Sequence, residues 1–202
     1  MKRLFQFVYL IVLLPATLAL AQTDYPKAEL FGGYSYFNAD GQDILDRQNF
    51  NGWGASITGN INRVIGITAQ FAGEYGSLDV DVPVGRTTAR ASADVSAYGF
   101  TFGPEFSYRL PKARVFFHPL VGALHSKASG GSVNVGGATI PIPELSESET
   151  NFGWVVGAGV DLAAHRLMAI RLFQFDYVGQ KSDPIANHFR IATGIVFRLG
   201  GQ

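Results

Sequence analysis

Apolar and polar residues alternate along most of this chain, in short segments that begin near residue 28. In one clear case Trp53, Ala55 and Ile57 alternate with Gly, Ser and Thr. Successive side chains of a β-strand point to opposite faces, so this pattern predicts strands with one apolar and one polar face. After residue 21 no apolar run is long enough to form a transmembrane helix. The chain is therefore restricted to a fold built from amphipathic strands.

The first 21 residues have the organisation of a secretory signal peptide. Two basic residues precede an apolar stretch from Leu4 to Leu20, which ends in small residues at Ala21. A charged start, an apolar middle and a small-residue cleavage site predict export with cleavage after Ala21. An exported chain made of alternating strands is typical of a barrel in the bacterial outer membrane.

The connections between the alternating segments are short and long in turn, which indicates how the strands are arranged. Bacterial barrels have short periplasmic turns, long outer loops and an even number of strands. We therefore predict an all-β fold, an eight-stranded antiparallel up-and-down transmembrane β-barrel, as a single domain over residues 22–202. The predicted strands lie in residues 28–37, 53–61, 65–75, 95–108, 115–125, 152–162, 167–177 and 189–199. The predicted long connections are residues 39–50, 76–94, 126–150 and 178–187.

Three of these segments depart from simple alternation. Pro104 has no amide hydrogen to donate, so we expect a local break in the strand pairing there. The apolar residues change phase at Leu172 and Phe173, which predicts a β-bulge. In residues 115–125 apolar residues occupy both phases, and the facing of this segment stays open.

Aromatic residues gather near both ends of the predicted strands. Amphipathic rings favour the two interfaces of a membrane, so two belts support a membrane barrel over a soluble sandwich. The belt near the long loops contains Tyr34, Tyr36, Trp53, Tyr75, Trp154 and Tyr177. The belt near the short turns contains Phe106, Tyr108 and Phe197, with Phe116 as a further member if its strand faces that way.

Charged residues of both signs fall in the polar phase of the strands. The interior of an eight-stranded barrel is just wide enough to be filled by side chains, so we expect these charges to pair and close the lumen. Because the first and last strands must be neighbours, Glu29 should approach Arg198, and Asp176 should face Arg190 across the last hairpin. The predicted network consists of Glu29, Glu74, Glu105, Arg109, Asp161, Arg171, Asp176, Arg190 and Arg198.

Composition argues against several classes of function. The chain has no Cys, and its four His residues show no metal-ligand spacing, so we expect no metal site and no cofactor. Cleavage of the signal peptide removes two of 16 basic residues and none of 16 acidic residues, which leaves a slightly acidic protein. A nucleic-acid partner would call for a basic patch, and we expect none.

The chain resembles the OmpA-like small outer-membrane β-barrel superfamily, in particular its single-domain members. The order of several short motifs carries the resemblance: ELFGGYSY at 29–36, FGP at 102–104, GAGVD at 157–161, RLFQFDY at 171–177 and GIVFRLG at 194–200. The ending is also similar to the signal read by the barrel-assembly machinery, with Phe197 and Leu199 at its alternating apolar positions. It departs from that signal in lacking a terminal Phe.

His125 and Ser126 suggest an enzymatic alternative, because some small barrels are lipid A deacylases that use a His base and a Ser nucleophile near the outer rim. Adjacent residues of a strand point to opposite faces, which makes His125 a poor base for Ser126. We therefore expect no catalysis.

The sequence thus predicts a monomeric structural or surface-interaction protein of the outer membrane. The resemblance implies contacts with outer-membrane lipid and lipopolysaccharide, and insertion by the barrel-assembly machinery. Three alternatives remain open: a narrow passive pore, a lipid-modifying enzyme at the rim, and a soluble periplasmic barrel with its apolar residues facing inward.

Overall fold

The computed structural model describes residues 25–40, 47–84, 87–135, 138–141, 146–181 and 186–200. The predicted signal peptide lies outside the described residues. Within them, no helix is long and apolar enough to cross a membrane. The strands are β1 (Ala28–Ala39), β2 (Gln48–Asn60), β3 (Ile65–Val84), β4 (Thr87–Arg109), β5 (Ala113–Val135), β6 (Ala138–Pro141), β7 (Ser146–His165), β8 (Met168–Gln180) and β9 (Ala186–Leu199).

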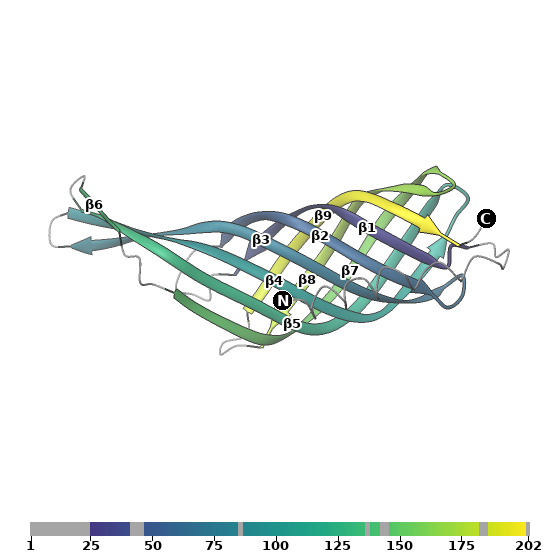
Figure 1. The fold of residues 1–202 in the computed structure, drawn as a ribbon, viewed down its shortest axis with the longest axis horizontal. Coiled ribbons are helices and arrows are strands. Elements are labelled where there is room, and N and C mark those ends of the chain that lie inside the picture. Colours follow the sequence, from purple (N-terminus) through teal and green to yellow (C-terminus); the bar gives the residue numbers. More distant parts are fainter. Residues whose placement is uncertain are drawn as a thin grey trace, which may run out of the picture.

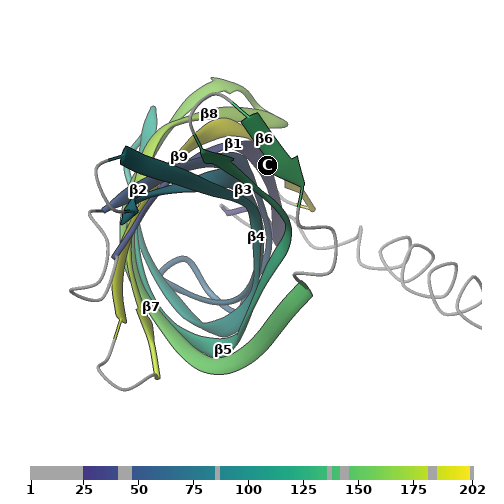
Figure 2. The same ribbon diagram turned by 90° about the vertical axis from the view of Figure 1, so that its left-hand side faces the viewer.

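Eight of these strands form a closed antiparallel barrel. The hydrogen-bonded order is β4-β3-β2-β1-β9-β8-β7-β5-β6, and a further pairing of β4 with β5 closes the ring. The short strand β6 pairs only with the far end of β5 and is not part of the wall. Viewed along its axis, the barrel is a continuous ring of strands (Figure 2). The predicted eight-stranded fold is therefore confirmed.

The outer face of the barrel is apolar and the inner face is polar. On β2, 48% of the Ile57 side chain is exposed, whereas the neighbouring Thr58 is only 3% exposed. The same alternation follows every strand of the wall, and large apolar residues cover the outside. An apolar exterior of this extent suits lipid and does not suit water. This facing excludes the alternative of a soluble barrel with its apolar residues inside.

Both predicted irregularities are present. The pairing of β4 with β5 stops after Phe102 and resumes at Phe106, so Pro104 lies in the break. On β8 the register shifts between Arg171 and Gln174. Leu172 and Phe173 therefore both face outward, and the polar residues on either side of them both face inward.

The structure settles the facing of the segment whose phase was ambiguous. On β5, Phe116 and Leu120 face the lumen and are each 1% exposed, whereas Phe117 and Val121 face outward. Phe116 is therefore not a member of the aromatic belt near the short turns. Sequence alternation could not decide this because a lumen filled with side chains accepts aromatic residues as readily as the lipid face does.

Two hairpins continue beyond the barrel on the side of the long connections (Figure 1). β3 pairs with β2 only as far as Tyr75, but its pairing with β4 continues to Val84 and Thr87. At 3.3 Å per residue, the β3–β4 hairpin extends roughly 30 Å past the last β2 rung.

The lumen holds apolar side chains as well as charges. One cluster, near the long connections, contains Phe37, Phe50, Leu120, Val155 and Val178. A second cluster contains Phe31, Ala169, Ala192 and Val196. Glycines of β7 make room for large neighbours, because a Cβ on Gly159 would lie 2.5 Å from the Phe116 ring.

Candidate functional site

Arg114 is the centre of a buried ion-pair network in the half of the lumen near the short turns. It lies at the start of β5 and is 1% exposed. Its guanidinium donates to Glu29 at 2.6 Å, to Glu105 at 2.9 Å and to Asp161 at 2.8 Å. One cation therefore joins carboxylates that come from β1, β4 and β7.

Glu29 is shared by three arginines. Besides Arg114, it accepts a hydrogen bond from Arg109 at 2.7 Å and lies 3.6 Å from Arg198 Nε. Glu29 and Arg198 are in direct register across the β1–β9 closure, which is the approach that strand order required. The side-chain amide of Asn60 also donates to Glu29, at 3.0 Å. These contacts tie the first and last strands together inside the barrel.

The network continues towards the long connections through β8. Arg171 donates to Asp161 at 2.8 Å and to the amide oxygen of Gln174 at 2.6 Å. Gln174 in turn donates to Asp176 at 2.7 Å, and Arg190 donates to the same carboxylate at 2.7 Å. Asp176 and Arg190 face each other across the β8–β9 hairpin. A connected path of charged and amide groups thus runs along the lumen.

Aromatic rings support the buried arginines. The Arg171 guanidinium carbon lies 4.2 Å from the ring centre of Phe31 and 4.3 Å from that of Phe116. Taking a charge out of water is costly unless it gains both ion pairs and hydrogen bonds, and cation–π contacts add to that compensation. The multiple partners of Arg114, Arg171 and Arg190 explain how this lumen holds so many charges.

The residues predicted for the network all face the inside of the barrel. Two important members were not predicted. They are Arg114, which joins three carboxylates, and His118, whose Nε2 lies 3.0 Å from Asp176. Both lie on β5. Arg114 precedes the predicted segment 115–125, and within that segment apolar residues occupy both faces. Arg114 and His118 are four positions apart, so their side chains point to the same face of the strand, and this spacing was the available signal.

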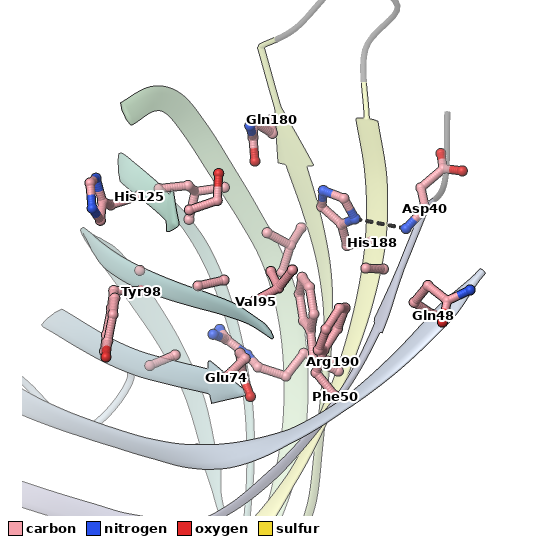
Figure 3. Close-up of a pocket in the computed structure, with 18 of the residues that line it drawn as sticks. Asp40, Gln48, Phe50, Glu74, Val95, Tyr98, His125, Gln180, His188 and Arg190 are labelled. Carbon is pink, nitrogen blue, oxygen red and sulfur yellow. Dashed lines mark hydrogen bonds between the residues drawn. The ribbon is translucent and has the colours of Figure 1, made fainter. Parts of the chain in front are cut away.

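A cavity of about 360 Å³ opens above the network, at the end of the barrel near the long connections (Figure 3). We call it the outer cavity. Apolar side chains form much of its wall, and Phe37, Phe50 and Val178 belong both to this wall and to the apolar cluster that contains Leu120 and Val155. His188 faces its mouth, where its Nδ1 accepts a hydrogen bond from the Asp40 amide at 2.9 Å. Arg190 joins the two regions, because it lines the cavity and also donates to Asp176 of the network.

Glu74 lines the outer cavity and differs from the other lumen carboxylates. Its side chain is buried, and Oε1 accepts a hydrogen bond from the Ser35 hydroxyl at 2.9 Å. Oε2 is also buried and has no hydrogen-bond partner. Among the described residues, Glu74 forms no ion pair within 4.0 Å, although the sequence predicted that the lumen charges would pair.

His125 and Ser126 lie at the rim of the same cavity on neighbouring positions of β5. The His125 ring makes its hydrogen bond to the Thr150 hydroxyl, at 2.8 Å. Figure 3 shows the His125 side chain directed away from the cavity interior. Ser126 is opposite Glu149 on β7. His125 is thus hydrogen-bonded to Thr150 and not to Ser126, as the alternation of a strand requires.

Comparison with known proteins agrees with this architecture. The family model described as outer membrane protein beta-barrel domain matches residues 7–197. The structure is similar to that of Ail, the attachment invasion locus protein of Yersinia pestis, with a TM-score of 0.53 and 19% identity over 86% of this chain and 99% of that one. It is also similar to the outer membrane protein OprG from Pseudomonas aeruginosa, with a TM-score of 0.53 and 8% identity over 88% of this chain and 98% of that one. No curated protein matches the sequence.

Proposed function

Because the chain belongs to the outer membrane protein beta-barrel domain family, we propose that it is a closed, non-conducting barrel that presents its long hairpins at the cell surface. Membership of this family implies the bacterial outer membrane as its location. The observation that carries the proposal is the continuous ion-pair network around Arg114, together with the apolar cluster above it. Because the charged side chains of this network are already paired with one another, they offer no binding sites to ions that would move along the axis of the barrel.

The two projecting hairpins carry the interaction role in this proposal. They extend the wall well past the last rung of β2, and their edge strands offer backbone groups to a partner strand. Glu147 and Glu149 are exposed on β7 in the same region. Carboxylates there would meet divalent cations that bridge lipopolysaccharide phosphates. The binding function therefore belongs to the hairpins and the barrel serves as their support.

The remaining partners follow from the same proposal. The apolar outer face contacts lipid and lipopolysaccharide, and the protein acts as a monomer without catalysis, cofactor or nucleic acid. Phe197 and Leu199 face outward at the end of β9. There they serve as the signal for the barrel-assembly machinery.

Planar-bilayer recording tests whether the lumen is closed. We expect the purified wild-type barrel to give no discrete conductance steps, because paired side chains fill the lumen. Arg114→Ala removes the central cation and a large side chain, so it should introduce steps or noise where the wild type has none. An outward substitution of similar size, Phe117→Ala, is the matched control and should stay silent. Regular steps from the wild-type protein would replace this proposal with a passive pore.

A further inference from the structure

We propose that the outer cavity binds a small organic cation, namely a primary amine with an apolar body, and that Glu74 is the group that pairs with its ammonium. This site goes beyond the proposed role of the barrel and its hairpins. Three features of the structure point to it: a buried carboxylate with one oxygen that accepts no hydrogen bond, an apolar wall around it, and an acidic rim. Each is independent of the others.

The first feature is the charge left over at Glu74. The lumen holds five carboxylates and five arginines, and each of the other four carboxylates lies within 2.9 Å of an arginine nitrogen. Glu74 is 4% exposed, forms no ion pair in the described part of the chain, and has one oxygen without any partner. A buried carboxylate in this situation is costly unless a ligand completes it.

Among the described residues, no arginine forms a hydrogen bond or an ion pair with Glu74, although Arg190 lies near enough to attract it electrostatically. Glu29 takes three of them at the opposite end of the lumen. Arg190 does line the outer cavity, but it donates to Asp176 from Nε at 3.0 Å and from Nη2 at 2.7 Å. The arginines and carboxylates are therefore equal in number but unevenly placed, and Glu74 is the carboxylate left without an ion pair in the described part of the chain.

The second feature is the shape and lining of the cavity. Phe37, Phe50, Val95, Leu124 and Val178 contribute apolar surface around Glu74. A volume of about 360 Å³ is in the range of small-molecule sites, which are mostly apolar with a few placed polar groups. Figure 3 shows Glu74 and Phe50 at the inner end of the cavity and His188 and Gln180 towards its mouth. An apolar body would fill this space while its ammonium reaches the carboxylate.

The third feature is the charge at the entrance. Asp40 and Glu149 line the outer part of the cavity, and Glu149 is exposed. Carboxylates around an opening raise the local concentration of cations and repel anions. A protonated amine is therefore favoured on approach as well as in the bound position.

Three ring compounds of the same size and different charge provide the test: 2-phenylethylamine, 2-phenylethanol and phenylacetate. Binding to the folded full-length mature barrel in detergent micelles is measured by titration calorimetry, with empty micelles subtracted. We expect the amine to bind about ten- to a hundredfold more tightly than the alcohol, which is what a charged hydrogen bond adds to a neutral one. Phenylacetate should not bind.

Two variants and one control identify the site. Glu74→Gln should lower the affinity for the amine to that for the alcohol. Leu124→Trp fills the cavity without altering Glu74, and should abolish binding of both compounds. Asp94→Asn removes an exposed carboxylate that does not line the cavity, and should leave the affinities for both compounds unchanged. The heat-modifiable gel mobility of each variant shows that it is folded.

The proposal is overturned by any of three results. If the wild type binds the amine and the alcohol equally well, the cavity is merely apolar. If folded Glu74→Gln still prefers the amine, the cation binds elsewhere. If the wild type binds none of the three compounds, there is no such site.

Discussion

Replacement of Arg114 by Met should destabilise the barrel more than any other single removal of charge. Arg114→Met keeps an apolar stem of similar length beside Phe116 but deletes the three ion pairs. Two of the abandoned carboxylates retain an arginine, since Glu29 keeps Arg109 at 2.7 Å and Asp161 keeps Arg171 at 2.8 Å. The loss therefore falls mainly on the third carboxylate.

That third carboxylate is Glu105, which is 2% exposed. Without Arg114, its nearest basic neighbour in the described residues is the His118 imidazole, with 3.7 Å between Nδ1 and Oε2. Breaking a buried ion pair by removing one partner costs about 3–5 kcal/mol, because the other charge stays buried and uncompensated. We expect a decrease of that size in the free energy of unfolding.

Urea unfolding in phospholipid vesicles, followed by tryptophan emission, measures this change. Arg166→Met, at an exposed turn position, is the control and should alter the free energy of unfolding by less than about 0.5 kcal/mol. Adding Glu105→Gln to Arg114→Met removes the stranded charge and should recover more than half of the loss. A loss below about 1 kcal/mol, or no recovery in the double variant, would refute the reasoning.

Two further predictions concern the lumen wall and the hairpins. Gly157→Ala would place a methyl group 2.0 Å from a carboxylate oxygen of the network. It should cost about 1–3 kcal/mol in the same unfolding assay, whereas Gly32→Ala, with nothing within 4 Å, should be close to neutral. An equal effect of the two changes would show that the lumen is looser than its contacts suggest. An epitope inserted between Val84 and Thr87 should bind antibody on intact cells if the hairpins lie outside. Binding only after permeabilisation would reverse the orientation of the barrel.

Much of the site could be predicted because, within the barrel wall, the charged residues of the strands lie in the polar phase. Once strand count and loop asymmetry fixed the topology, Glu29 and Arg198 had to be neighbours across the closure, and they are in register. The bulge on β8 was likewise visible as a change of phase at Leu172. These features depend on local periodicity, which the sequence carries directly.

The pattern of pairing inside the lumen was not predictable in the same way. Alternation predicts that Glu74 and Arg190 both point inward, but it does not predict how far apart they lie along the axis. That separation depends on the stagger of strands around the closed ring. One carboxylate consequently has an unbonded oxygen while one arginine has three partners.

The sequence by itself determined the strand count, the apolar outer surface and the charged character of the interior. These follow from composition and from a period of two, both of which are local properties of the chain. Only the tertiary structure decided which face of β5 looks inward, which charges meet, and that an apolar cavity lies above them. Closing the barrel brings residues more than a hundred positions apart into one narrow space, as with Gln70 and Arg190. Contacts of that kind arise from strand stagger and side-chain volume, which no local pattern encodes.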